Sequence, residues 1–345
     1  MAKTYSNLFE EIVSFPNLLA AYFEARRGKL NCASIMKINR NYEDVIFTLQ
    51  KELREKTWEP KQYREFLCVT EVKRRIINAP AFEDRIVHHA MAKVIRPLFE
   101  RKYIYDSYAT IKNKGTHKAV YRVQDFLKRA ARRGESVYIL QCDISKYYQS
   151  IDHDVLIEQI ERTIRDKEVV ELWKKIIDGF SDTGKGVPIG SLTSQLAANI
   201  YLNVLDHFVK ECMQIKYYVR YMDDFVLIGN SKEELWKNLA DIKWLVEGHL
   251  KLKLNRKTKI YPASRGVDFA GYRTFTSYIL PRKRNIKAAK KRFKDLSHKY
   301  KNGEMDLESV RQRVTSFLGY VKHCQAKRTT ISTLKWLKLR RKIKW

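Results

Sequence analysis

Apolar residues recur at helical spacing near both ends of this chain. Within residues 1–60, Val45, Ile46, Leu49 and Leu53 fall on one helical face, and this stripe ends near Trp58. Pro60 follows closely, as expected beyond the end of a helix. The same period predicts helices across three regions, which are residues 1–60, 232–252 and 276–345.

The middle of the chain contains strand-like runs that end in acidic residues. Residues 216–229 predict a hairpin with Met222, Asp223 and Asp224 at its turn. A second apolar run, residues 136–143, ends in Asp143. These acidic groups are 80 residues apart in sequence, yet both lie on β-type segments that could be neighbours in one sheet.

The acidic groups point to metal chemistry. Adjacent carboxylates repel each other unless a cation neutralises them, and an acid at the end of a buried strand is costly without a partner. Hard oxygen ligands suit Mg²⁺ or Mn²⁺. Asp143, Asp223 and Asp224 together would hold two ions for in-line phosphoryl transfer. The alternative for the pair at 223–224 is a solvated acidic turn.

A basic hairpin is predicted around residues 66–77. Its tip carries Lys73, Arg74 and Arg75, flanked by β-type residues. Cations at such a tip could hold a nucleotide triphosphate, because Arg forks match phosphate oxygens. They could equally be solvated.

A glycine-rich loop in residues 184–195 opens another predicted helix. Such a loop can approach a nucleotide closely, although it matches no known phosphate-binding fingerprint. Apolar residues at every fourth position, from Leu192 to Phe208, predict that this helix buries one face.

Other polar residues have structural interpretations. Glu83 and Asp84 suit the first turn of a helix that begins near residue 80. His88 and His89 are adjacent, so they point to different sides and chelate poorly. Asp152 and Asp154 are predicted to cap a helix.

The net charge of the chain says more about its binding partner than its length does. The chain has 345 residues, of which 68 are Lys or Arg and 39 are Asp or Glu, giving +29. This excess implies a polyanionic partner, most simply nucleic acid. No apolar run is long enough to span a membrane, and the N-terminus carries no signal-peptide pattern. Five cysteines without metal-ligand spacing suggest reduced, mostly packed thiols in a cytoplasmic protein.

The positive charge is concentrated towards the C-terminus. The last 70 residues hold 21 Lys or Arg and 4 Asp or Glu, a net of +17. Helical apolar stripes in the same region predict a small helical domain that grips a nucleic-acid backbone. The alternative is a basic solvated face. Upstream lies a cation-rich segment in which one lysine could protonate a departing pyrophosphate, with three candidates left open: Lys253, Lys257 and Lys259.

The order of these segments resembles that of reverse transcriptases. The basic hairpin, the Asp143 strand, the glycine loop, the Tyr-Met-Asp-Asp turn at 221–224 and the Phe-Ala-Gly-Tyr turn at 269–272 occur in the family's order. The sequence Ile-Gly-Ser-Leu-Thr-Ser-Gln at 189–195 is similar to the branch found in diversity-generating retroelements. Relatives of the group II intron type commonly have Gln at its first position.

The resemblance implies an α+β fold shaped like a right hand. Its expected parts are an N-terminal segment with fingers at 1–135, a palm at 136–275 and a basic helical thumb at 276–345. The palm would combine an antiparallel sheet with helices and would include a nucleotide-pocket loop at 181–195.

The resemblance also assigns roles to individual residues. Asp143, Asp223 and Asp224 would be catalytic metal ligands, and Ile144 joins the predicted metal site. Tyr148 would be the steric gate against a ribose 2′-hydroxyl. The remaining nucleotide contacts would come from Lys73, Arg75, Ile189, Gly190 and Gln195. Primer or template contacts would come from Tyr221, Met222, Phe269, Gly271 and Tyr272.

The implied function is RNA-directed DNA synthesis with two Mg²⁺ or Mn²⁺ ions, a template RNA, dNTPs and a cDNA product. In the retroelement branch, copying is error-prone at template adenines. Ile189 would suit this property because it removes a polar restraint. That branch also implies a small basic, oligomeric accessory protein. Tyr108-Ala-Thr-Ile-Lys112 lacks the family's usual Arg-Pro. A phage-defence reverse transcriptase and a non-catalytic, maturase-like RNA scaffold are the alternatives.

Overall fold

The computed structural model of the chain describes residues 4–68, 75–132 and 134–340. Its contacts divide the chain into two compact units, which are described separately. The first unit comprises Met1–Ile111, Asp143–Lys216 and Asn238–Lys257. The second comprises Lys112–Cys142, Tyr217–Lys237 and Thr258–Trp345. The boundaries predicted for fingers, palm and thumb remain predictions.

The first unit is mainly helical, as predicted for the N-terminal residues. Its helices are α1 (Phe9–Val13), α2 (Phe15–Arg26), α3 (Ala33–Asn39), α4 (Tyr42–Arg54), α5 (Phe82–Glu100), α7 (Tyr147–Ser150), α8 (His153–Glu161), α9 (Lys167–Asp178) and α10 (Leu192–His207). Two π-helical turns, η1 (Phe208–Cys212) and η2 (Trp244–His249), also belong to this unit. Helix α11 (Lys232–Lys243) has residues in both units.

Helix α10 corrects one prediction. Its apolar spacing predicts a single buried face, but its buried residues lie all round the helix and include Thr193, Asn199 and Asp206. The reason is that α10 packs against both α5 and α8. Small and polar residues fill the sides that the apolar period does not mark. Asn199, for example, donates from Nδ2 to the carbonyl oxygen of Ala109 at 2.9 Å.

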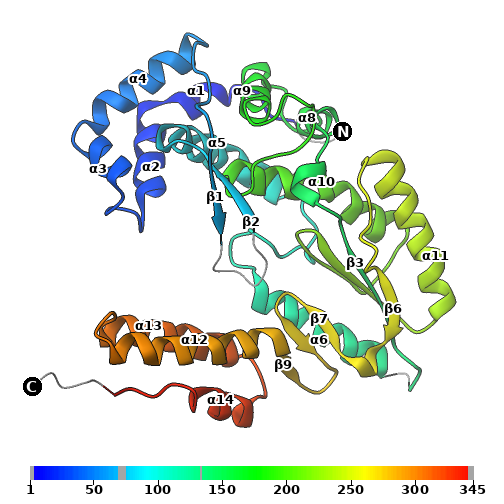
Figure 1. The fold of residues 1–345 in the computed structure, drawn as a ribbon. Coiled ribbons are helices and arrows are strands. Elements are labelled where there is room, and N and C mark those ends of the chain that lie inside the picture. The colour runs from blue at the N-terminus through cyan, green and yellow to red at the C-terminus, as the bar shows by residue number, and fades with distance from the viewer. Residues whose placement is uncertain (1–3, 69–74, 133, 341–345) are drawn as a thin grey trace, which may run out of the picture. The chain divides into compact units, whose positions relative to one another are not determined.

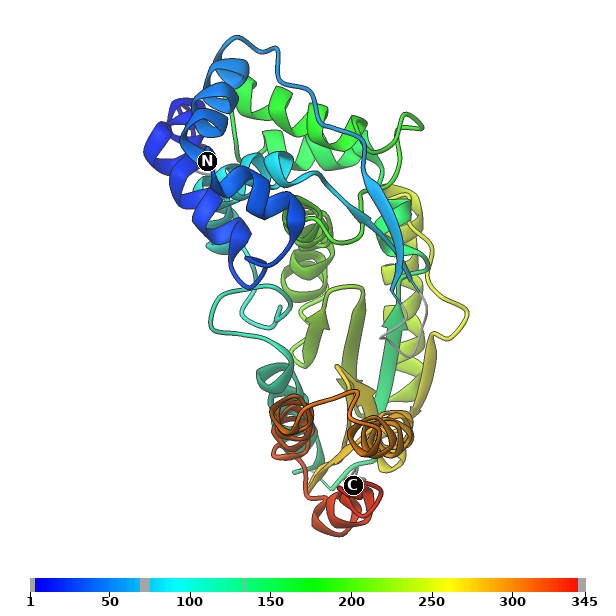
Figure 2. The ribbon, with the colours of Figure 1, turned by 60° about the vertical axis from the view of Figure 1, so that its left-hand side comes forward.

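The predicted basic hairpin is present. Strands β1 (Arg64–Cys68) and β2 (Arg75–Ala79) pair antiparallel, with Cys68 opposite Arg75. Figures 1 and 2 both show the two strands next to each other. Lys73 and Arg74, at the predicted tip, lie outside the described residues.

The second unit contains two sheets. The order of the four-stranded sheet is β4-β5-β3-β6, with β4 antiparallel to β5 and β3 antiparallel to β6. Its strands are β3 (Tyr138–Asp143), β4 (Tyr218–Tyr221), β5 (Asp224–Gly229) and β6 (Lys259–Pro262). Asp143, the last residue of β3, is grouped with the first unit. Helix α6 (Thr116–Ala131) packs against β4 and β5.

A three-stranded antiparallel sheet follows a short 3₁₀ turn, η3 (Ala263–Arg265). The turn predicted at residues 266–272 joins β7 (Val267–Phe269) to β8 (Tyr272–Thr274). The sequence did not predict the third strand, β9 (Ile279–Pro281), which is short and ends in proline. Such a strand offers little periodicity to detect.

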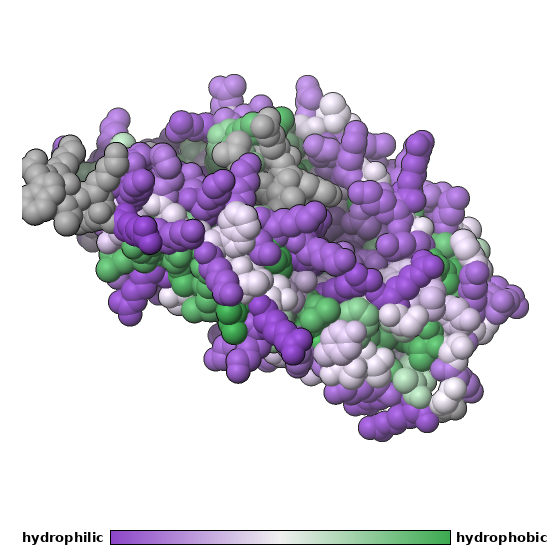
Figure 3. Space-filling model, turned by 60° about the horizontal axis from the view of Figure 1, so that its bottom comes forward, coloured by the Kyte–Doolittle hydropathy of each residue, from purple (hydrophilic) through white to green (hydrophobic). Residues whose placement is uncertain are grey.

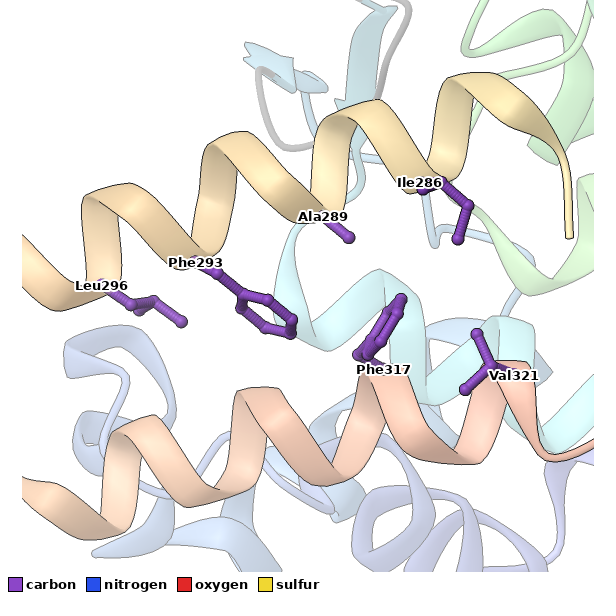
Figure 4. Close-up of a cluster of buried hydrophobic side chains, with 6 residues drawn as sticks. All are labelled: Ile286, Ala289, Phe293, Leu296, Phe317 and Val321. Atoms are coloured by element: carbon purple, nitrogen blue, oxygen red, sulfur yellow. The ribbon is translucent and has the colours of Figure 1, made fainter. Parts of the chain in front are cut away.

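The described part of the C-terminal segment, up to residue 340, forms three helices, and its apolar stripes predict helical structure: α12 (Lys283–Lys301), α13 (Leu307–Val321) and α14 (Lys327–Leu334). Figure 4 shows Phe293 of α12 and Phe317 of α13 facing each other across the shared core. Their rings meet edge to face, with centroids 5.2 Å apart. Figure 3 brings these helices forward, and hydrophilic side chains cover most of that face.

The sequence predicts that no segment spans a membrane and that the cysteines are mostly packed. Within the described ranges, no helix combines the length and apolar character that crossing a bilayer requires. Among the cysteines, Cys142 is buried, Cys68 and Cys324 are half-buried, and Cys32 and Cys212 are exposed.

Candidate active site

The acidic turn has the predicted hairpin geometry. Tyr221, the last residue of β4, pairs with Asp224, the first residue of β5, so Met222 and Asp223 form a two-residue turn. Met222 has a φ of 57°, a left-handed conformation that is uncommon for a residue other than glycine. The next four residues of β5 are buried. A buried strand therefore fixes the position at which Asp224 emerges.

A buried arginine supports this turn. Arg220 is fully buried (0% exposed) and its Nη1 donates to the carbonyl oxygen of Met222 at 3.2 Å. This hydrogen bond anchors the backbone of the turn that carries Asp223. Arg220 was not predicted, because one arginine among 68 Lys and Arg residues carries no distinctive signal.

The charge of Asp224 also reaches the edge strand of the sheet. Burial is the main factor that raises the pKa of the Tyr261 phenol on β6, and the negative charges of Asp268 and Asp224 add to it. The Tyr261 hydroxyl donates to Gln141 Oε1 at 2.9 Å. Gln141 on β3 in turn donates to the Asp268 carbonyl oxygen at 2.7 Å. These contacts link β6 and β3 to β7, the strand that carries Asp268.

Asn255 holds Asp143 in place at the end of β3. Asn255 donates from Nδ2 to Asp143 Oδ2 at 2.8 Å, and its backbone N–H donates to the Asp143 carbonyl oxygen at 2.7 Å. The next residue, Ile144, forms a β-bridge with Leu254. The Ile144 side chain is buried and apolar, so only its backbone oxygen could serve a metal. Asn255 was not predicted, because it lies within a basic run without any motif.

The donor chemistry of these residues fits divalent cations. Strand β3, which ends at Asp143, is the sheet neighbour of β5, which begins at Asp224. Carboxylates are the oxygen donors that Mg²⁺ and Mn²⁺ prefer. Among the residues that the structure describes, no three His, Cys, Asp or Glu side chains are close enough together to hold a metal ion. The assignment of metal ligands therefore depends on donor type and strand position.

The glycine-rich loop contacts the basic hairpin. The backbone N–H of Asn78 on β2 donates to the Ile189 carbonyl oxygen at 3.1 Å. Gly190 has a φ of 115°, and a Cβ atom there would lie 2.9 Å from Ile77 Cγ2. Glycine is thus required at 190 both by the backbone conformation and by the approach of β2. Arg75, whose backbone opens β2, is joined to this loop through the hairpin.

Tyr148 and Gln195 flank the same loop. The Tyr148 carbonyl oxygen accepts a hydrogen bond from Val187 N at 2.8 Å, and the Tyr148 side chain is half-buried. Gln195 is half-buried in the first turn of α10. Ser191 Oγ lies 3.0 Å from His88 Nδ1. Burial lowers the pKa of His88 to about 3, so it is a neutral packing residue, as predicted.

The residues predicted near the primer are largely buried. Phe269 and Tyr272 are buried, and the turn between them places Gly271 at a φ of 92°. The Tyr320 hydroxyl donates to the Gly271 carbonyl oxygen at 2.8 Å. Phe269 and Tyr272 therefore hold the shape of this turn. Tyr221 is half-buried, and its hydroxyl accepts a hydrogen bond from Thr116 Oγ1 at 3.1 Å.

A basic pocket of about 390 Å³ opens between β6 and the start of α12. It has one carboxylate, from Asp268, which forms an ion pair with Arg282. Its lining includes six cations: Lys259, Arg265, Arg273, Arg282, Lys283 and Arg284. Lys253, Lys257 and Lys259 are all exposed, so the structure does not distinguish them as proton donors.

Comparisons with known proteins establish the family. Residues 61–274, more than half of the chain, match the family described as reverse transcriptase (RNA-dependent DNA polymerase). The chain belongs to this family.

Two curated relatives show how far the likeness extends. The protein YkfC of Escherichia coli K12 is 30% identical over 251 residues, covering 61% of this chain and 65% of YkfC. The group II intron-encoded protein LtrA of Lactococcus lactis is 23% identical over 303 residues, covering 67% of this chain and 49% of LtrA. The chain thus spans between about half and two thirds of the length of these relatives.

A solved structure supports the fold. Apo telomerase from Candida tropicalis aligns with 82% of this chain and 60% of its own, with a TM-score of 0.51 at 13% identity. Together with the family match, this confirms the predicted class. The chain has the reverse transcriptase fold, in which helices accompany antiparallel sheets as in right-hand polymerases.

Proposed function

We propose that this chain is an RNA-directed DNA polymerase. The observation that carries the proposal is the sheet order β4-β5-β3-β6, in which the strand ending at Asp143 neighbours the strand beginning at Asp224. Carboxylates on neighbouring strands of one sheet suit the binding of divalent ions. Asp143, Asp223 and Asp224 would hold two Mg²⁺ or Mn²⁺ ions, with the backbone oxygen of Ile144 beside them.

The bound ions would supply charge neutralisation and a more acidic 3′-hydroxyl for in-line phosphoryl transfer. The protein's own part is to hold the carboxylates in place. Asn255 fixes the position of one carboxylate oxygen of Asp143. Arg220 stabilises the turn that presents Asp223. Such supporting contacts set the orientation of metal ligands.

The incoming dNTP would bind along the glycine-rich loop. Contact between this loop and β2 supports a pocket in which Lys73 and Arg75 meet the triphosphate. Tyr148 would face the sugar as the steric gate. Ile189, Gly190 and Gln195 would line the base and phosphate positions.

Template RNA and cDNA would bind basic surfaces of the second unit. The six-cation pocket and the exposed cations of α12 suit a phosphate backbone, which cations recognise without regard to sequence. The turn at Gly271, together with Tyr221 and Met222, would guide the primer end.

The direct test is extension of a labelled primer on an RNA template with dNTPs and Mg²⁺ or Mn²⁺. The wild-type protein should extend the primer. Asp223→Asn should remove extension, because one metal ligand loses its charge. Asp241→Asn, an exposed position on α11, is the matched control and should extend normally. Extension that survives Asp223→Asn would contradict the proposal.

We further propose that copying is error-prone at template adenines, as in a diversity-generating retroelement, with a small basic accessory protein as partner. Ile189 gives the pocket an apolar contact where a glutamine could hydrogen-bond, and polar contacts are what discriminate strongly between substrates. Ile189→Gln should lower misincorporation opposite adenine. Ile189→Leu keeps the apolar contact and should leave the error rate unchanged. Equal error rates in all three proteins, measured by sequencing the cDNA, would refute the idea.

A second candidate is binding of intron RNA, because LtrA is named a group II intron-encoded protein. The basic pocket would serve this function as well as polymerisation. Asp223→Asn separates the two roles, since it should remove cDNA synthesis and leave RNA affinity unchanged. A protein that binds RNA tightly but never extends a primer would favour the scaffold.

A further inference from the structure

An acidic pocket lies in the N-terminal part of this strongly basic chain. It has a volume of about 320 Å³ and is formed by α4, the segment after it and the first turn of α5. It shares no residue with the polymerase site or the basic pocket. Five carboxylates line it against a single lysine, Lys61, and they belong to Asp44, Glu52, Glu59, Glu83 and Asp84.

Local cations neutralise only part of this charge. Lys61 Nζ lies 2.9 Å from Glu83 Oε1, and Lys175 Nζ lies 2.6 Å from Glu59 Oε1. In the part of the chain that the structure describes, no Lys, Arg or His side chain forms an ion pair with the other three carboxylates, those of Asp44, Glu52 and Asp84.

Asp84 is the second, independent sign of a ligand. It lines the pocket but is only 1% exposed. Its Oδ2 accepts the backbone N–H of Lys61 at 2.9 Å, whereas Oδ1 has no hydrogen-bond partner among the described residues. Burial raises the pKa of Asp84 to about 6. The backbone hydrogen bond from Lys61 and the charge of Lys61 oppose this rise, and the charges of Glu83 and Glu52 add to it. A buried carboxylate left half-satisfied is costly, so a cation near it has a clear physical benefit.

The other walls indicate what kind of cation fits. Val45, Leu49 and Trp58 contribute apolar surface to the pocket, and Leu49 and Trp58 are buried. Apolar walls beside carboxylates suit a methylene chain that ends in a charged nitrogen. A bare metal ion would gain nothing from those walls. We propose that the acidic pocket binds an aliphatic cation, an ammonium or guanidinium carried on a methylene chain.

This chemistry has two sources, a free polyamine or a Lys or Arg side chain of a partner protein. The test uses the full chain, freed of nucleic acid by nuclease and a high-salt wash. Spermidine and the peptide acetyl-Lys-Arg-Lys-amide are titrated separately, with calorimetry and thermal unfolding as readouts. The variants are Asp84→Asn and Glu52→Gln. Glu55→Gln, an exposed acid that does not line the pocket, is the matched control.

At least one of the two probes should bind the wild-type protein and Glu55→Gln and raise their melting temperatures. Affinity should fall by at least about tenfold in Asp84→Asn and in Glu52→Gln. Binding of spermidine alone would identify a free polyamine, and binding of the peptide alone would identify a partner's side chain. An equal shift from MgCl₂ at the same ionic strength would overturn the proposal. So would binding of neither probe, or unchanged binding in both variants. These readouts do not depend on polymerase activity, so the proposed function and this inference can fail separately.

Discussion

At the scale of single residues, the sequence identifies the candidate metal ligands better than it identifies the residues that hold them in place. Asp143, Asp223 and Asp224 stand out because acids at the ends of apolar strands are rare and costly. Asn255 and Arg220, which hold them, do not stand out, since Asn255 lies in a basic run without a motif and Arg220 is one of 68 Lys and Arg residues. Their roles depend on contacts across 112 residues of sequence for Asn255, and on complete burial for Arg220. Neither property can be read from neighbours in the chain.

The first residue-scale prediction concerns Asn255. Asn255→Ala should lower primer extension by about 10- to 100-fold, as loss of a ligand-orienting contact typically does. Extra Mg²⁺ or Mn²⁺ should recover part of the loss, because the Asp143 carboxylate itself is intact. Asn302→Ala, at an exposed turn after α12, serves as control. A folded Asn255→Ala protein with wild-type rates at all metal concentrations would contradict this role.

The second residue-scale prediction is the pH dependence due to Asp84. Its pKa is about 6 in the folded protein and 3.8 in the reference state, so ionisation above pH 6 disfavours folding. Asp84→Asn should therefore raise the free energy of unfolding at pH 8 by about 2–3 kcal/mol. The gain should shrink as the pH falls through 6 and vanish near pH 4. Denaturant unfolding of the wild-type and Asp84→Asn proteins at several pH values measures it.

At the scale of elements, the sequence predicted which segments form helices and hairpins but not how completely each is buried. The hairpins at β1–β2 and β4–β5 follow from alternating β-type residues. Helix α10 was predicted to bury one face and instead is buried all round, because burial depends on the helices that pack around it. The strand β9 was missed for a similar reason, since its partner β8 defines it.

The element-scale prediction concerns the contact between the glycine-rich loop and β2. Gly190→Ala introduces backbone strain at φ 115° and a clash with Ile77. Strain of this kind costs about 1–3 kcal/mol, so the free energy of unfolding should fall by more than that. Gly303→Ala is the matched control, because Gly303 has a φ of 79° and open space around it. Gly303→Ala should lose stability through backbone strain alone. Adding Ile77→Ala to Gly190→Ala removes the clash and should recover the difference in stability between the two glycine variants.

Thermal unfolding and the KM for dNTP are the measurements for these loop variants. Because the loop is expected to form the nucleotide pocket, Gly190→Ala should raise the KM for dNTP, whereas Gly303→Ala should not. If Gly190→Ala and Gly303→Ala lose equal stability, the approach of Ile77 is not tight.

At the scale of the whole molecule, composition reveals the net charge of the chain but not where the charges lie. The net charge of +29 predicts a nucleic-acid partner. Composition does not reveal that an acidic pocket is set within this basic chain, because averaging over 345 residues hides it. Only the fold brings carboxylates from α4 and α5 together.

The whole-molecule prediction concerns salt. Lys283→Gln combined with Arg284→Gln removes two exposed cations from the basic pocket. Affinity for a primer–template duplex should fall uniformly across sequences, and the slope of log affinity against log salt should decrease by about two. Lys51→Gln with Arg54→Gln, two exposed cations on α4, should change the slope little. Fluorescence anisotropy at several salt concentrations makes the comparison.

The sheet order has a consequence for how the chain is made. Strand β3 has two neighbours, β5 and β6, and both come later in the sequence, at residues 224 and 259. At ribosomal speeds of about 5–20 residues per second, roughly 4–16 s pass between synthesis of residue 143 and arrival of β5. During that time β3 is a nascent strand with two open edges. Newly made chains therefore have a window in which they can aggregate or recruit a chaperone before the sheet is complete.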